Sequence, residues 1–234
     1  MNRHVFILST LVLAFAVSAA AIWYTSRPAP IAAIEAVSPQ LAEALVRPYS
    51  PVLGPEEAPV TVVEFFDPAC EACRAFHPIV KDIMDEHGDA VRVVIRYTPF
   101  HGEASEQGIR ILEAARMQGV YEPVLEAILR EQPRWAPHGA QEESLALLLL
   151  AIGSNAGLDL DAARSQMLMP DLVGIMNQDL ADVEALGIRQ TPTFFVNGKK
   201  VEPFGEDQLR AMIAEEVAVA AQDLEPQTNV SIGQ

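Results

Sequence analysis

The chain carries both of its cysteines in one stretch, Val60-Thr-Val-Val-Glu-Phe-Phe-Asp-Pro-Ala-Cys70-Glu-Ala-Cys73-Arg-Ala-Phe-His-Pro78. Residues 60–66 are apolar at all but two positions and rich in β-branched and aromatic side chains, which predicts an interior strand. Asp67-Pro68 breaks the strand, and a helix is expected to open at Cys70. Cys70 and Cys73 are three residues apart, so they share one face of the first helical turn.

The two cysteines have different expected reactivities. The thiolate is the reactive form of cysteine, and a helix N-terminus stabilises it through unpaired N–H groups and a partial positive charge. Cys70, at the start of the helix, is therefore predicted to be an exposed nucleophile with a low pKa. Cys73, one turn further on, is predicted to be more buried and to resolve a mixed disulfide formed at Cys70.

A C-x-x-C pair also occurs as half of a zinc site or as a structural disulfide. Zinc usually takes four ligands, and this chain has no third cysteine. His77 could join in the spacing C-x-x-C-x-x-x-H, but no fourth ligand is evident. The sequence therefore favours a redox pair, and no metal is predicted.

Glu64 lies six residues before Cys70, inside the apolar strand. A carboxylate there would be buried behind the cysteines, and burial would raise its pKa. It could then carry a proton to or from Cys73, which makes Glu64 a candidate catalytic residue. The alternative is an edge strand in which Glu64 faces water. Pro78, five residues after Cys73, should kink the helix rather than end it.

The thioredoxin superfamily has an active-site segment that resembles Glu64-Phe-Phe-x-x-x-Cys70-x-x-Cys73 with Pro78 after it. The resemblance is greatest to the DsbA-like thiol–disulfide oxidoreductases of the bacterial cell envelope. A second similar motif is Leu186-Gly-Ile-Arg-Gln-Thr-Pro192-Thr-Phe-Phe-Val-Asn-Gly198. Two motifs in the expected order, with a helical stretch between them, make the resemblance specific, and it spans about residues 48–220.

The resemblance implies an α/β thioredoxin fold with an inserted all-helical subdomain. It also implies a cis peptide bond at Thr191–Pro192, packed beside the cysteines; such bonds are essentially confined to X-Pro. The backbone of Thr191 would then pair with an extended substrate segment, so Thr191 and Pro192 are the predicted substrate-binding residues. The alternative is an ordinary trans proline at the head of a strand.

These motifs divide the chain into six predicted parts. They are a signal peptide or N-terminal membrane anchor (1–26), a linker (27–55), the first part of the thioredoxin fold (56–103), the helical insert (104–186), the second part of the thioredoxin fold (187–221) and a disordered tail (222–234).

Local patterns predict the remaining elements. Residues 91–97 alternate as a second strand, and strand, helix and strand in this order imply a right-handed parallel unit. Asn197-Gly198 is a strong hairpin signal, so residues 199–202 should return antiparallel. His101 is predicted to lie in a solvated loop, and the alternative is a position near the catalytic surface. The other expected helices are 105–118, 121–131, 142–156, 160–169, 171–186 and 206–221.

The N-terminal segment has the features of an export signal. Arg3 precedes an uncharged run from Val5 to Tyr24, which is long enough to span a bilayer. Small residues at Val17-Ser-Ala19 offer a cleavage site, whereas Trp23-Tyr24 suits the interfacial belt of an uncleaved anchor. Both alternatives export the rest of the chain, which predicts a bacterial protein of the periplasm or cell envelope, where cysteine pairs cycle as disulfides.

The composition of the chain and its resemblance to the DsbA-like family limit the classes of partner that it is expected to bind. The net charge is −16, which argues against a nucleic-acid partner because phosphates require a basic face. The resemblance implies protein substrates with cysteines or disulfides, and a membrane or soluble redox partner that resets the pair. It implies no cofactor.

The two residues between the cysteines tune the redox potential through the stability of the Cys70 thiolate. The strongly oxidising members of the resembled family carry Pro-His there, whereas this chain has Glu71-Ala72. Loss of the His removes a donor, and Glu71 adds a negative charge, so a less oxidising couple is expected. Thr191 also resembles the isomerase- and reductase-type relatives, which leaves a disulfide reductase or isomerase as an alternative to a net oxidase. A non-catalytic chaperone and a metal-binding envelope protein are the alternatives outside redox catalysis.

Overall fold

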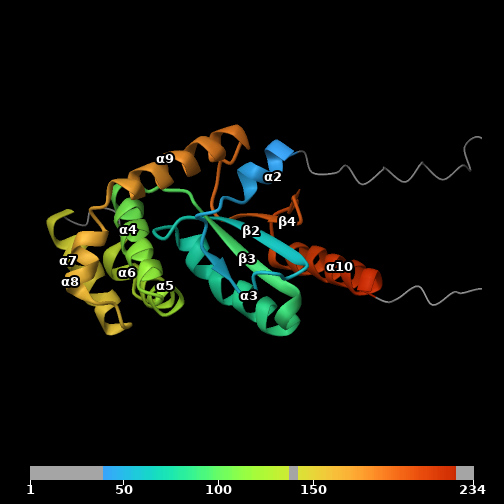
Figure 1. Cartoon of the computed structure of the whole chain (residues 1–234), viewed down its shortest axis with the longest axis horizontal. Helices are drawn as coiled ribbons and strands as arrows, with labels where there is room; N and C mark the ends of the chain where they lie inside the picture. The colour runs from blue at the N-terminus through green and yellow to red at the C-terminus, as the bar shows by residue number, and fades with distance from the viewer. Residues whose placement is uncertain (1–38, 137–141, 225–234) are drawn as a thin grey trace, which may run out of the picture. The chain divides into compact units, whose positions relative to one another are not determined.

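A computed structural model describes residues 39–136 and 142–224 (Figure 1). The predicted targeting segment, the first part of the predicted linker and residues 225–234 of the predicted tail lie outside the described residues. The described chain forms a five-stranded sheet, with an all-helical stretch between the third and fourth strands in chain order. The predicted α/β fold with a helical insert is confirmed. No helix in the described ranges combines the length and apolar character that a membrane crossing requires.

β2 (Val60–Phe66) lies at the centre of the sheet. It pairs in parallel with β3 (Val91–Tyr97) and antiparallel with β4 (Thr193–Val196). β1 (Val52–Leu53) pairs antiparallel with β3, and β5 (Lys199–Lys200) pairs antiparallel with β4, which gives the order β1-β3-β2-β4-β5. Because β2 has a neighbour on each side, the edge-strand alternative for the glutamate in this strand is wrong.

Helices make up most of the remaining described chain (Figure 1). The helices from α4 to α9 form the helical insert between β3 and β4. α6 is a short helix that the sequence pattern does not predict, and the other insert helices begin and end within a few residues of their predicted bounds. In chain order the helices are α2 (Pro39–Leu45), α3 (Glu71–His87), the 3-10 turn η1 (Gly88–Ala90), α4 (Glu103–Met117), α5 (Tyr121–Arg130), α6 (Gln132–Trp135), α7 (Glu142–Asn155), α8 (Leu160–Gln166), α9 (Pro170–Ala185) and α10 (Glu206–Leu224).

Alternate residues of β2 enter two separate hydrophobic clusters, as the two-residue period of a strand requires. Val62 and Phe66 belong to the larger cluster, which includes residues of α3, α10 and the helical insert. Val63 and Phe65 belong to the smaller cluster on the other face, with residues of α2 and α9. Glu64 alternates in phase with Val62 and Phe66, so its side chain points to the face that α3 covers.

Residues 39–55 are ordered against the sheet, although their sequence pattern predicts a linker without a strand. α2 packs against α9, and β1 adds an edge to the sheet. Leu45 is buried, and Arg47 and Tyr49 bind carboxylates of α9 that lie at least 130 positions away in the sequence. Local patterning did not indicate these contacts, because both partners are far apart along the chain.

The turn after β4 follows from the Asn-Gly pair. Asn197 has φ 45° and Gly198 has φ 83°, and positive φ at both central positions matches the twist of a two-residue hairpin. The returning strand β5 is shorter than the predicted 199–202.

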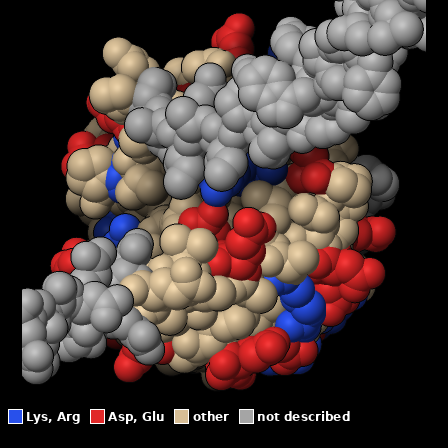
Figure 2. Space-filling view, turned by 90° about the vertical axis from the view of Figure 1, so that its right-hand side faces the viewer, with Lys and Arg blue, Asp and Glu red and all other residues tan. Residues whose placement is uncertain are grey.

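On the face of the molecule seen in Figure 2, Asp and Glu side chains lie in several patches among uncharged residues, and Lys and Arg occupy fewer places. Several cations of the chain are held in ion pairs, such as Lys199 with Glu216 and Arg210 with Glu86. A face of this charge repels phosphate groups rather than binding them.

Candidate active site

The cysteines lie where the central strand leads into its helix. β2 ends at Phe66, and Cys70 is the N-cap residue of α3, with extended backbone angles of φ −78° and ψ 124°. Cys73 lies inside the first turn and is 0% exposed. Both cysteines are free thiols in this structure. Cys70 is only 8% exposed, so the expectation of an exposed nucleophile is too strong, because the loop before β4 lies against its sulfur.

The surroundings move the pKa values of the two thiols in opposite directions. The pKa of Cys70 falls to about 5, chiefly because the Cys73 thiol donates a hydrogen bond to its sulfur, while burial acts in the opposite sense. The Thr191 side chain and the backbone N–H groups of Cys73 and Ala72 also lower it. The pKa of Cys73 rises well above its usual value, first through burial and then through its bond to Cys70. At neutral pH, Cys70 is therefore the thiolate and Cys73 the thiol.

Glu64 is buried in β2, 3% exposed, between Ile95 of β3 and Phe194 of β4. Its Oε1 atom has no hydrogen-bond partner among the described residues. Burial, followed by the charge of Cys70, raises the pKa of Glu64 to about 8, and Glu64 in turn raises the pKa of Cys73. The expected buried acid is thus present and interacts electrostatically with both thiols. It can hold a proton at neutral pH.

The raised pKa of Glu64 makes the stability of the reduced protein depend on pH. The unfolded chain loses this proton near pH 4.5, whereas the folded chain keeps it until about pH 8, so stability falls as pH rises across that range. The Gln side chain of Glu64→Gln cannot ionise, so its contribution to the free energy of unfolding does not change with pH. We expect the free energy of unfolding of Glu64→Gln, relative to that of the wild type, to be about 2 kcal/mol higher at pH 7 than at pH 5. Urea unfolding at both pH values measures the difference. Glu57→Gln, at an exposed carboxylate, is the matched control, and an equal response of both variants would contradict the prediction.

The Thr191–Pro192 peptide bond is cis, as predicted. The sulfur of Cys70 lies 3.3 Å from the carbonyl oxygen of Thr191, across 121 positions of sequence, and donates to it when Cys70 is protonated. Thr191 is half-buried and Pro192 is buried. The backbone of Thr191 therefore lies beside the Cys70 sulfur, where an extended segment of another chain could pair with it.

Asp67 ends the strand and also forms hydrogen bonds around the cysteine turn. Its buried carboxylate accepts hydrogen bonds from the backbone N–H groups of Ala69 (2.9 Å), Phe100 (2.9 Å) and His101 (3.2 Å). Nδ1 of His101 lies 2.6 Å from the same carboxylate, and the N–H of Asp67 donates to Sγ of Cys73 at 3.4 Å. One side chain thus joins the cysteine turn to the loop after β3. His101 lies in the loop after β3 and is exposed, as predicted, and its ring is also bound to Asp67.

The predicted redox-tuning residues Glu71 and Ala72 are both exposed in the first turn of α3. A carboxylate there is favoured by the helix dipole, although it places a negative charge beside the thiolate. Ala72 contributes through its backbone N–H, which lowers the pKa of Cys70.

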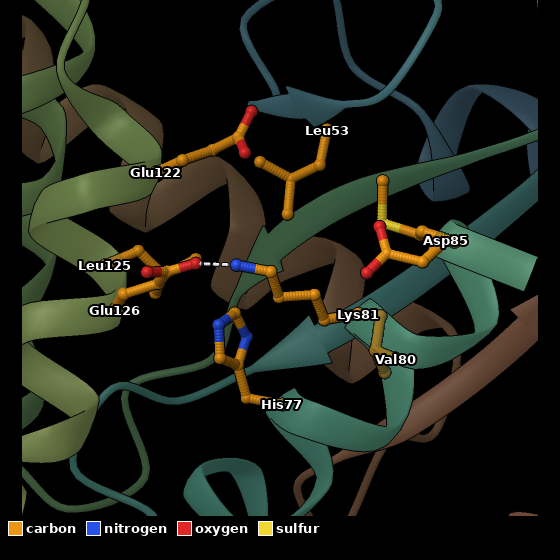
Figure 3. A pocket seen from close by; sticks show the side chains of 9 residues that line it. Leu53, His77, Val80, Lys81, Asp85, Glu122, Leu125 and Glu126 are labelled. Carbon is orange, nitrogen blue, oxygen red and sulfur yellow. Dashed lines mark hydrogen bonds and ion pairs between the residues drawn. The ribbon is translucent and has the colours of Figure 1, made fainter. Parts of the chain in front are cut away.

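His77 lines a pocket between α3 and α5, next to the ion pair of Lys81 and Glu126 (Figure 3). Burial lowers the pKa of His77, and its Nε2 atom has no hydrogen-bond partner in the described chain. Neither cysteine lines this pocket. Within residues 39–136 and 142–224, no three His, Cys, Asp or Glu side chains are grouped so as to hold a metal ion. The arrangement does not favour a metal site of the two cysteines with His77.

A family model described as thioredoxin matches residues 47–215 of the chain. The chain belongs to the thioredoxin family. A thioredoxin-like oxidoreductase from Silicibacter pomeroyi DSS-3 is 32% identical, and the match covers 77% of this chain and 97% of that one with a TM-score of 0.63. α-DsbA1 from Wolbachia pipientis, 20% identical, shares the fold with a TM-score of 0.67 over 79% of this chain and 99% of that one. In fold, the chain therefore resembles a DsbA protein.

Curated relatives of this thioredoxin-family chain carry two kinds of name. Disulfide bond formation protein D from Bacillus subtilis (strain 168) is 26% identical over 179 residues, which are 71% of this chain and 77% of that protein. The Na(+)/H(+) antiporter NhaA from Herminiimonas arsenicoxydans is 31% identical over 150 residues, which are 64% of this chain and 22% of that protein. The chain spans about a quarter of the length of the antiporter-named relatives, so the likeness concerns one part of them.

Proposed function

We propose that this protein is a thiol–disulfide oxidoreductase that exchanges disulfides with protein substrates through the Cys70–Cys73 pair. The observation that carries the proposal is at the start of α3, where the pKa of Cys70 is lowered and that of Cys73 is raised. The Thr191 backbone lies against the Cys70 sulfur. A reactive thiolate, a protonated resolving thiol and a backbone edge beside the reactive sulfur are what exchange with an extended protein segment requires. Membership of the thioredoxin family supports the same activity.

In the oxidising direction, a substrate thiolate attacks Sγ of Cys70 in the Cys70–Cys73 disulfide. The new sulfur–sulfur bond joins the substrate to Cys70, and Cys73 leaves as a thiolate and takes up a proton. A second substrate thiolate then attacks the substrate sulfur of the mixed disulfide, and Cys70 leaves as a thiolate. Two electrons pass from the substrate to the cysteine pair, and no cofactor takes part. The reducing direction reverses each step.

Glu64 supplies the proton that Cys73 takes up, and it accepts that proton in reverse. Its pKa of about 8 keeps it protonated at neutral pH, and a proton donor works best when its pKa is near the working pH. Cys73 is 0% exposed, so bulk water has little access to it. A buried acid on the same face of the sheet is therefore the suitable proton source.

Thr191 and Pro192 form the substrate-binding edge. A cavity lies beside this loop, and its lining includes the apolar side chains of Ile188, Phe194 and Phe204. The lining also includes the charged side chains of Arg189, Lys200 and Glu202. An extended substrate segment would pair with the backbone of Thr191 and place one of its side chains in this cavity.

We expect the couple to be less oxidising than that of the most oxidising relatives. Thiolate pKa values near 3.5 and 7 accompany potentials of about −120 and −270 mV in DsbA and thioredoxin. The pKa of Cys70 is about 5, and about 30 mV per pKa unit from either reference gives a range of roughly −210 to −160 mV. Equilibration of the protein with glutathione measures the potential. A value near −120 mV would identify a strong oxidase, and one below about −270 mV a reductase; each would contradict the stated range.

The protein acts in the cell envelope, where a membrane or soluble redox partner resets the pair. The uncharged run from Val5 to Tyr24 supports export. The similarity to Disulfide bond formation protein D supports a function in which this chain acts on the cysteines of other proteins.

A further inference from the structure

Gln132 joins the helical insert to the turn that carries Cys70. It is the first residue of α6 and is 1% exposed. Its Nε2 donates to the carbonyl oxygens of Pro68 at 2.8 Å and of Cys70 at 3.0 Å. Its Oε1 accepts from Nε of Arg74 at 3.0 Å. One buried side chain from the insert thus contacts both sides of the cysteine turn.

The partners of Gln132 allow only one orientation of its amide. The two carbonyl oxygens can only accept hydrogen bonds, and the guanidinium of Arg74 can only donate them. A flipped amide would turn Oε1 toward the carbonyls and Nε2 toward the guanidinium, which would break all three bonds. The site therefore requires two donors and one acceptor on a side chain of this length.

Gly108 of α4 brings a second part of the insert against the same turn. A Cβ atom at this position would lie 2.8 Å from Cγ of Pro68 and 3.3 Å from the ring of Trp135 in α6. The close approach of α4 to the turn is possible because glycine has no side chain. The turn is thus held by packing from α4 and by hydrogen bonds from α6.

We propose that Gln132 is a positioning residue through which the helical insert holds the turn at Pro68–Cys70 in the geometry that keeps the sulfur of Cys70 reactive. The inference rests on the proposed exchange function. The N–H groups of Cys73 and Ala72 donate to the Cys70 sulfur, and their direction depends on how the turn enters α3. The Cys70 carbonyl also accepts the first helical bond from the N–H of Arg74 at 3.1 Å. Gln132 adds a second donor from outside α3 and binds the Pro68 carbonyl as well, so it restrains the turn and keeps the donors aimed at the sulfur, as a strong hydrogen bond requires.

The variant Gln132→Met tests this role, because methionine keeps the volume but removes the donors and the acceptor. The thiolate absorbance of Cys70, followed against pH, should titrate about one unit higher than in the wild type, which is a tenfold change in the acid dissociation constant. The equilibrium with glutathione should shift about tenfold toward the disulfide form of the protein, or about 30 mV. A purely structural role for Gln132 would lower the melting temperature and move neither quantity.

Gln118→Met is the matched control. Gln118 also uses both ends of its amide, on Gln166 and Asp159, but it does so where α4 meets α8. This variant should leave the titration and the glutathione equilibrium unchanged. An unshifted titration of Gln132→Met, or an equal shift in Gln118→Met, overturns the inference.

If Gln132→Met does not fold, Arg74→Lys carries the test, because it keeps the charge but removes the planar Nε donor. It should shift the titration in the same direction, and an unchanged titration overturns the inference. Exchange by the wild type with a small disulfide is measured in parallel. A wild type that exchanges while the variant titrates normally refutes only the role of Gln132, whereas a wild type without exchange refutes the proposed function.

Discussion

Cys70→Ser should lose disulfide exchange down to the uncatalysed background. The hydroxyl of serine stays protonated at neutral pH and forms no disulfide, so no mixed intermediate can arise. The variant should fold, because serine is nearly isosteric with cysteine and Cys70 retains some exposure, at 8%. Reduction of a protein disulfide by the prereduced variant, followed against the wild type, measures the loss.

Cys73→Ser is the matched variant and should give a different result. Cys70 can still attack a substrate disulfide, but no thiol is present to resolve the product, so the substrate should accumulate as a mixed disulfide at Cys70. Mass spectrometry of the non-reduced mixture detects this adduct. Undiminished disulfide reduction by Cys70→Ser would contradict the exchange mechanism proposed here for Cys70.

Arg96→Met should cause the largest loss of stability among the substitutions considered. Arg96 of β3 is 0% exposed and binds Oδ1 of Asp179 at 2.7 Å and Oδ2 of Asp182 at 2.6 Å, both on α9. It also donates to the carbonyl oxygen of Ala44 in α2. Removing the cation leaves two carboxylates with little access to water and without their shared partner, which typically costs about 3–5 kcal/mol.

Urea unfolding of the reduced protein measures this loss. Arg164→Met is the matched control, since it breaks the Arg164–Asp161 pair, whose side chains are 58% and 95% exposed. Exposed pairs contribute little, so the control should unfold at nearly the same urea concentration as the wild type. A similarly small change for Arg96→Met would contradict a stabilising role of the buried network, and the order of the segment before β2 would then have another cause.

Much of the fold could be predicted because its signals are local. The apolar run of β2, the break at Asp67-Pro68 and the Asn197-Gly198 turn each depend on neighbours in the sequence. The strand period and the turn chemistry act over a few residues, so they can be read without a structure. The strand β1 and the packing of residues 39–55 against the sheet could not be predicted, because distant partners such as the carboxylates of α9 hold this segment.

The candidate site likewise consists of residues that the sequence indicates and residues that only the structure reveals. The C-x-x-C spacing and the glutamate inside an apolar strand are visible in the sequence, and they indicated Cys70, Cys73 and Glu64 as candidates. Thr191 and Pro192 became candidates only through the resemblance to the DsbA-like family. Asp67 and Gln132 were missed as parts of the site, and a position of His101 near it was only the alternative. An Asp at a strand end or a Gln in a helical stretch carries no distinguishing local pattern.

Local sequence determines the types and order of the helices and strands. It also identifies the reactive cysteines, because the interactions involved act between residues close together in the chain. The low exposure of Cys70, its pKa of about 5 and the burial of Glu64 arise only when segments far apart in the chain meet. Gln132 reaches the cysteine turn across 62 positions, and Thr191 reaches Cys70 across 121. Desolvation and hydrogen bonds set these pKa values, and both depend on which groups the folded chain places around the site.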